Sequence, residues 1–192
     1  DQGILPFDEP FRRLFNQGIV YRNGAKMSKS QGNVVNPDEL VAKYGSDSLR
    51  LYELYMGPPD LFCEWGDHGI EGVFRFLKRV WKLAAENAGN ADLADDAEIV
   101  KLRHRTVKTA TQRMQNFQFN TFISLMMEYV NALVKRPAVS RGIVRDLVIM
   151  LAPMAPHVGE ELFERMGETC SVFTERWPGY DEALAAVDSV TL

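Results

Sequence analysis

The residues best suited to chemistry lie in the run Lys26-Met27-Ser28-Lys29-Ser30-Gln31-Gly32-Asn33. Two lysines three positions apart place two ammonium groups in one short loop, among small hydroxyl side chains. Serine hydroxyls and nearby backbone N–H groups can donate hydrogen bonds to phosphate oxygens. A lysine is a compact cation on a flexible stem, so it suits negative charge that develops and then leaves, as when pyrophosphate departs from a nucleotide. One contact that tightens in the transition state is typically worth about 3 kcal/mol. By composition alone, the same run is also typical of a solvated basic turn.

A second group of cations lies farther along the chain and could hold a nucleic-acid backbone. Lys101, Arg105 and Lys108 follow one another at i, i+4 and i+7, which places them on one face of a predicted helix. A row of cations on a helix can track phosphates, although a solvated helix face has the same pattern. A similar but less regular set precedes it, made of Arg75, Lys78, Arg79 and Lys82.

The elements that must position the lysine-rich loop begin with a short strand over residues 18–21, followed by a tight turn at Arg22-Asn23-Gly24. After the loop, Asn36 is expected to cap a helix whose first residue is Pro37 and which Gly45 ends. Ser46 is expected to cap the next helix. A linker containing Cys63, Trp65 and Gly66 should follow.

The rest of the chain has a helical pattern. Asp67 is the expected cap of the first helix, on which one apolar stripe holds Ile70, Val73, Phe74, Leu77, Val80, Trp81 and Ala84. Further helices are predicted over 97–115, 120–135 and 140–151, with a short one ending at Met166. Residues around Trp177 should be irregular, with one more helical turn. The fold class is therefore mainly α, with the tail of an α/β domain leading into an antiparallel helical bundle.

Composition limits the classes of protein that this chain can be. Its 192 residues carry 22 Lys and Arg against 26 Asp and Glu, and 46% of them are hydrophobic, which is typical of a folded globular chain. The longest apolar run, 147–156, is about half of what a membrane span needs. Two isolated cysteines exclude a disulfide framework and favour a cytoplasmic protein. We expect no metal site, and we expect the chain, which begins with Asp1, to start within a longer protein.

The net charge of −4 conceals a basic middle. Residues 101–113 hold five basic side chains and no acidic one, whereas residues 140–192 hold four basic and nine acidic ones. A local basic face can still bind a phosphate backbone in a mildly acidic protein.

Residues 26–30 match, letter for letter, the KMSKS signature of class I aminoacyl-tRNA synthetases. Gly32-Asn33, Asn36-Pro37 and the run from Tyr44 to Arg50 extend the match. Within that class the chain resembles the leucyl-tRNA synthetases over nearly its whole length, through the stretches 50–58, 76–81, 151–162 and 177–182. The resemblance implies the end of a Rossmann-like catalytic domain with the KMSKS loop and connecting helices over 1–66. It also implies an anticodon-binding-type helical bundle over 67–168 and an irregular extension over 169–192.

The resemblance also implies a function, namely ATP-dependent attachment of leucine to its tRNA. Lys29 and Lys26 are then the catalytic candidates, and ATP is contacted by Lys26, Met27, Ser28, Lys29 and Ser30. The tRNA would be held through its backbone by Lys101, Arg105, Lys108 and Arg79. Mg²⁺ would arrive with ATP, and the chain itself would hold no cofactor.

Several expectations about the isolated chain follow. The family's HIGH motif is not found in it, so we expect no adenylate synthesis by this chain alone. The parent protein should be a monomer, but exposed Phe7, Phe11, Leu14 and Phe15 could make this chain self-associate. The alternatives are an isoleucyl- or valyl-tRNA synthetase segment, a non-catalytic RNA-binding helical module, and a purely structural bundle.

Overall fold

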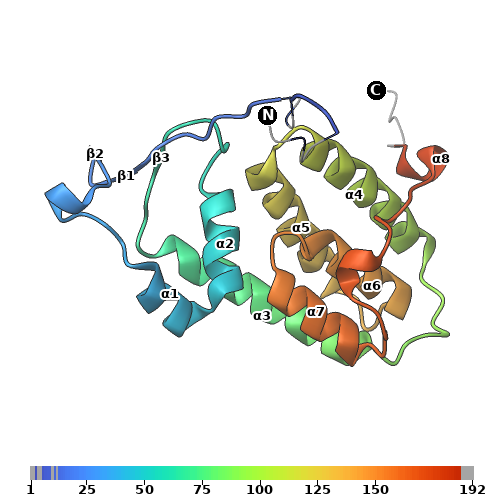
Figure 1. Cartoon of the computed structure of the whole chain (residues 1–192). Helices are drawn as coiled ribbons and strands as arrows, with labels where there is room; N and C mark the ends of the chain where they lie inside the picture. Colours follow the sequence, from blue (N-terminus) through green and yellow to red (C-terminus); the bar gives the residue numbers. More distant parts are fainter. Residues whose placement is uncertain (1–2, 4–5, 10, 12, 187–192) are drawn as a thin grey trace, which may run out of the picture.

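The computed structural model describes residues 3, 6–9, 11 and 13–186. Helices dominate this part of the chain, and a small mixed sheet lies at one end of it, which confirms the predicted mainly α class (Figure 1). The strands are β1 (Val20–Arg22), β2 (Ala25–Lys26) and β3 (Cys63–Glu64), and a 3₁₀ turn, η1, spans Lys29–Gln31. The helices are α1 (Pro37–Tyr44), α2 (Ser46–Tyr55), α3 (Gly69–Asn87), α4 (Ala97–Gln115), α5 (Phe119–Leu133), α6 (Arg141–Leu151), α7 (Pro156–Arg165) and α8 (Glu182–Ala185), with a 3₁₀ turn, η2, at Val172–Thr174.

The sheet has the order β2-β1-β3 and contains two short strands, β2 and β3, that the sequence pattern did not reveal. The predicted strand and tight turn are present as β1 and the turn after it, in which Asn23 and Gly24 adopt positive φ values of 55° and 72° and which leads into β2. Such a turn matches the twist of the two strands that it joins. β3 pairs in parallel with β1, with Val20 opposite Cys63, where the sequence indicated a linker. A two-residue strand is too short to show a periodic pattern, so that prediction was wrong.

Helix α1 begins and ends as predicted, but α2 does not begin with the predicted cap. Asn36 Oδ1 accepts the N–H of Asp38 at 3.1 Å, and Gly45 ends α1 with a φ of 84°. Ser46 is the first residue of α2 rather than its cap. Its hydroxyl lies 3.2 Å from Nδ1 of His157, at the start of α7, and therefore joins two helices instead.

The start of α3 also differs from the prediction, because Asp67 does not cap it. The Asp67 carboxylate accepts hydrogen bonds from Arg22 Nη2 at 3.0 and 3.1 Å and from Trp65 Nε1 at 2.9 Å. The Arg22 guanidinium accordingly lowers the pKa of Asp67, and the Trp65 hydrogen bond lowers it further. Asp67 thus fastens β1 to the segment between β3 and α3.

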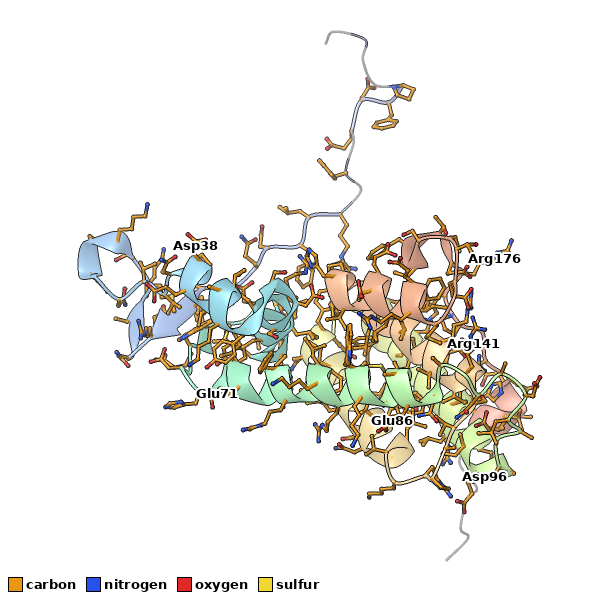
Figure 2. All side chains as sticks on the ribbon, turned by 90° about the horizontal axis from the view of Figure 1, so that it is seen from below. Asp38, Glu71, Glu86, Asp96, Arg141 and Arg176 are labelled. Atoms are coloured by element: carbon orange, nitrogen blue, oxygen red, sulfur yellow. The ribbon has the colours of Figure 1, made fainter. Side chains whose placement is uncertain are left out.

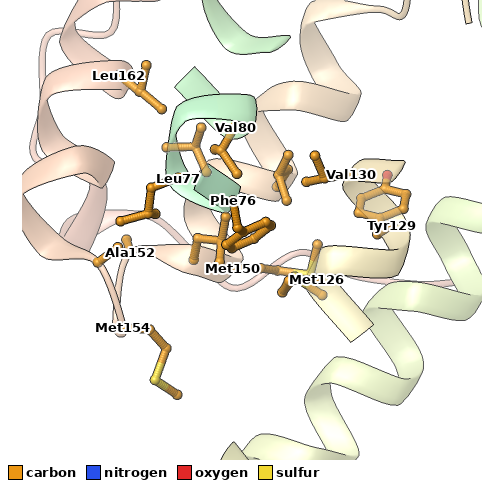
Figure 3. Close-up of a cluster of buried hydrophobic side chains, with 14 of the residues drawn as sticks. Phe76, Leu77, Val80, Met126, Tyr129, Val130, Met150, Ala152, Met154 and Leu162 are labelled. Atoms are coloured by element: carbon orange, nitrogen blue, oxygen red, sulfur yellow. The ribbon is translucent and has the colours of Figure 1, made fainter. Parts of the chain in front are cut away.

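The hydrophobic core surrounds α3, which packs against α2, α5, α6 and α7. Figure 3 shows Phe76 and Val80 of α3 among Met126 of α5, Met150 of α6 and Leu162 of α7. The predicted stripe is largely buried, but Phe74 and Trp81 are only half-buried at its edge, and Phe76 and Leu83 take interior positions instead. No helix in the described residues is long and apolar enough to cross a membrane.

The later helices follow the sequence pattern closely. α4 has the predicted bounds, α5 begins one residue early and ends two residues early, and Ser140 caps α6 by accepting the N–H of Ile143 at 3.3 Å. Beyond α7, η2 and α8 are the only helical turns in the described residues, in keeping with the predicted irregular stretch. In Figure 1 the β1–β2 hairpin lies at the opposite end of the molecule from α4 and α8.

Candidate functional site

The Lys26–Asn33 loop leaves the sheet at Lys26, the last residue of β2, and turns back at η1. Ser28 is extended, with φ −154° and ψ 150°, and it precedes the 3₁₀ turn that starts at Lys29. The N–H of Gln31 donates to the carbonyl of Ser28 at 3.2 Å, and the N–H of Gly32 donates to the carbonyl of Lys29 at 3.3 Å. Gly32 closes the turn with a φ of 66°, which glycine adopts without strain.

One side chain of the loop packs against the core, whereas others are exposed to solvent. Met27 packs against the core and lines an apolar cavity of about 420 Å³, together with Val35, Leu40 and other side chains of the sheet, α1 and α2. Lys26, Lys29 and Ser30 are exposed. The hydroxyls of Ser28 and Ser30 lie 3.1 Å apart. The loop therefore exposes both lysines, and their ammonium groups and the two serine hydroxyls can donate hydrogen bonds to phosphate oxygens.

Sequence reasoning missed the residue that closes the neck of this loop. Asn33 makes three hydrogen bonds there, to the N–H of Ser28 and to the carbonyls of Ala25 and Lys26. The only sequence signal for it was its place directly after Gly32 in the extended match.

The predicted cation row on α4 is partly covered. Lys108 Nζ lies 2.5 Å from a carboxylate oxygen of Glu182 in α8, and this ion pair raises the pKa of Lys108. The N–H of Asp181 donates to His104 Nδ1 at 2.9 Å. Lys101 and Arg105 are half-buried on the same helix. Helical spacing could not show that α8, more than 70 residues away from Lys108 in the sequence, packs on this helix.

The basic set on α3 is more accessible. Arg75, Lys78, Arg79 and Lys82 are all exposed along a helix that Figure 2 shows running between Glu71 and Glu86. Lys78 Nζ lies 4.4 Å from the centre of the Phe74 ring, and Lys82 Nζ lies 3.7 Å from Glu86. Neither contact buries these cations, so they can still bind phosphate groups.

Other candidate groups take structural positions. In the described residues no group of three or more His, Cys, Asp and Glu side chains could hold a metal ion. Two glutamates of α7 are engaged, since Glu160 accepts the N–H of Val172 at 3.1 Å and Glu161 pairs with Arg165 at 2.7 Å. Cys63 is half-buried, and Cys170 is exposed.

The apolar residues near the start of the chain are mostly exposed, as the prediction of self-association requires. Phe7, Phe11 and Leu14 have at least half of their surface in solvent. Phe15 differs, because its ring stacks on Phe117 with centroids 4.8 Å apart.

Two family models match this chain. Residues 96–191 match the anticodon-binding domain of tRNA ligases, and residues 5–58 match class I tRNA synthetases of the I, L, M and V group. The first match contains the candidate cations of α4, the second contains the Lys26–Asn33 loop, and the basic set on α3 lies between the two.

Individual relatives agree with the family models. A leucine–tRNA ligase of Pseudothermotoga lettingae is 41% identical over all of this chain and 26% of its own length. The crystal structure of a ternary LeuRS–tRNA–LeuAMS complex of Agrobacterium radiobacter K84 superposes with a TM-score of 0.82 at 33% identity, over 97% of this chain and 26% of that one. A Mycobacterium tuberculosis methionyl-tRNA synthetase, in complex with methionyl-adenylate, shares the fold with a TM-score of 0.65 at 19% identity, over 85% of this chain and 40% of that one. The chain thus spans about a quarter of the length of its leucyl relatives.

Proposed function

The chain belongs to the family of anticodon-binding domains of tRNA ligases, and on this premise we propose that it forms part of a leucine–tRNA ligase. In this role it supplies a loop that contacts ATP and helices that bind tRNA. The observation that carries the proposal is the Lys26–Asn33 loop, a fixed turn that presents Lys26 and Lys29 to solvent.

In the proposed reaction, the carboxylate of leucine attacks the α-phosphate of ATP, giving leucyl-adenylate and pyrophosphate. Negative charge grows on the phosphate oxygens as the bond to pyrophosphate breaks. Lys29, at the exposed start of η1, stabilises that negative charge, and Lys26, at the end of β2, adds to this stabilisation. Ser28 and Ser30 shape the turn through their hydroxyl contact. Mg²⁺ accompanying ATP supplies further charge neutralisation when it is bound.

The test is leucine-dependent ATP–pyrophosphate exchange by the ligase that contains this chain. Lys29→Ala should lower kcat roughly 100-fold, because one transition-state contact of this kind is worth about 3 kcal/mol. The KM for leucine should stay unchanged. Lys43→Ala, which removes an exposed lysine on the neighbouring helix α1, is the matched control. Equal activities of the two variants would contradict the proposed role of the loop.

We also propose that this chain alone does not form leucyl-adenylate, because it spans about a quarter of its leucyl relatives. Measurable exchange by the isolated chain would contradict this.

The tRNA contacts that we propose are to the phosphate backbone, through Arg79 on α3 and through Lys101, Arg105 and Lys108 on α4. The accessibility of α3 favours Arg79 and its exposed neighbours. Lys108 can join only if a phosphate replaces Glu182 as its partner. Contacts of this kind carry no sequence information by themselves, so these four cations alone would not distinguish leucine tRNA from another tRNA.

Binding of leucine tRNA at several salt concentrations tests these contacts. Each cation that neutralises a phosphate adds about 0.7 to 0.9 to the slope of log K against log salt concentration. Arg79→Ala and the double variant Lys101→Ala/Arg105→Ala should each weaken binding and flatten that slope. Lys135→Ala, which removes an exposed lysine beyond α5, should change neither. An unchanged slope in all three would show that these faces are solvated surface.

A further inference from the structure

Asn33 lies outside the five residues of the signature, yet its carboxamide ties the loop together at its neck. Oδ1 accepts the N–H of Ser28 at 2.9 Å. Nδ2 donates to the carbonyl of Ala25 at 3.3 Å and to the carbonyl of Lys26 at 3.2 Å. One half-buried side chain therefore holds three backbone groups that lie five to eight residues before it in the sequence.

The three bonded groups lie on the two sides of Met27. Ala25 and Lys26 form β2, which pairs with β1 on one side only. Ser28 leads into η1, where Lys29 begins the turn. By bonding to both sides at once, Asn33 fixes the angle between the end of the strand and the start of the turn. That angle sets where Lys29 lies relative to Lys26.

The hydrogen bonds at the neck of the loop require a carboxamide side chain at position 33. A primary amide offers an acceptor and an NH₂ group on one planar carbon, and the neck of the loop uses both. Aspartate could accept the Ser28 N–H, but its second oxygen would face the carbonyl oxygens of Ala25 and Lys26. Alanine would leave all three backbone groups without this partner.

We propose that Asn33 is a positioning residue for Lys26 and Lys29, and that it acts on adenylate formation only through them. This rests on the proposed function of the loop. A catalytic group displaced by about 1 Å can lose a hundredfold in rate. Removing the carboxamide should therefore lower kcat roughly 10- to 100-fold and leave the KM for leucine unchanged.

The first experiment does not depend on enzymatic activity and uses this chain by itself. Hydrogen exchange at the Ser28 amide, followed by NMR, should become at least about 10-fold faster in Asn33→Ala, because the amide loses its acceptor. Asn33→Asp keeps that acceptor and should be intermediate. Asn36→Ala is the matched control, since it removes an equivalent side-chain bond at the cap of α1, three residues away. Unchanged exchange at Ser28 in Asn33→Ala would overturn the proposal.

The second experiment measures leucine-dependent pyrophosphate exchange in the ligase that contains this chain. Asn33→Ala should lower kcat in the natural background and have no effect in a Lys26→Ala/Lys29→Ala background, because a positioning residue has nothing left to position there. An equal loss in both backgrounds would overturn the proposal, since it would show that Asn33 acts through overall folding. If the double lysine variant is itself fully active, the proposed function of the loop fails.

Discussion

Asp47 is the buried carboxylate that joins the segment after the lysine-rich loop to the helical bundle. It lies in the first turn of α2 and is 4% exposed. Oδ2 accepts the N–H of Val158 at 2.6 Å, and Oδ1 lies 2.8 Å from His157 Nδ1. Val158 is in the first turn of α7, a helix whose own cap position, Ala155, provides no side-chain acceptor. Asp47 therefore caps α7 from another helix, and we predict that Asp47→Ala destabilises the chain severely.

The size of the effect can be worked out from these contacts. Loss of a capping side chain costs about 0.5 to 2 kcal/mol, and a hydrogen bond to a charged group contributes about 1.5 to 3 kcal/mol. The His157 side chain is 74% exposed, so its pairing with Asp47 is screened by solvent and adds less than about 1 kcal/mol. Asp47→Ala should thus cost about 2 to 3 kcal/mol. His157→Ala should cost about 0.5 kcal/mol, because it leaves the bond to Val158 intact.

Urea unfolding at neutral pH, followed by circular dichroism, measures the loss of stability in both variants. The midpoint should fall much further for Asp47→Ala than for His157→Ala, with little change in the denaturant slope. Hydrogen exchange at the Val158 amide should become faster only in Asp47→Ala. Equal losses in the two variants would refute the reasoning, because they would assign the stabilisation to the contact with His157 rather than to the cap.

Three further predictions concern other parts of the molecule. Gly69→Ala should cost about 1 to 3 kcal/mol in urea unfolding, since the new Cβ would lie 2.4 Å from the ring of Tyr52, and full stability would contradict this. Tyr129→Phe should leave the thermal midpoint unchanged or raise it, because the buried Tyr129 hydroxyl has no hydrogen-bond partner among the described residues, and a clear fall would show an unrecognised one. Burial, aided by the charge of Arg103, lowers the pKa of His104, so docking of α8 should be complete above about pH 6.5 and weaken as the pH falls through the native pKa. The Asp181 amide resonance should report this change, and a constant resonance between pH 7.5 and 5 would contradict it.

The sequence predicted the fold best where one helix carries a long apolar pattern. α4 begins at the predicted residue because the Asp96 side chain accepts the N–H of Ile99. The pattern failed where a side chain had a better partner far away in the sequence. Asp67 is a good cap by type, but Arg22 and Trp65 engage its carboxylate.

In the candidate site, too, local sequence features were predicted, whereas partners set by the folding of the chain were not. The types and spacing of Lys26 to Ser30 predicted an exposed loop that carries cations, and the structure has one. The residue that fixes this loop, Asn33, could not be recognised, because its three bonds depend on how the chain folds back between β2 and η1. Likewise, helical spacing aligned Lys108 with Lys101 and Arg105 and gave no sign of its partner Glu182.

Helix α3 connects the two proposed functions physically. Its exposed side carries the accessible cations, and its buried side packs against α2, α5, α6 and α7. The segment that leads into its first turn is fastened to α2 and to the sheet, because the Tyr52 hydroxyl of α2 donates to the carbonyl of Gly66 at 2.7 Å and Arg22 of β1 binds Asp67. Arg22 lies only four residues before Lys26, so the same junction that orients α3 also orients the strand from which the loop leaves. A substitution such as Gly69→Ala, at this junction, should therefore disturb both the cation row and the loop, whereas Asn33→Ala should disturb the loop alone.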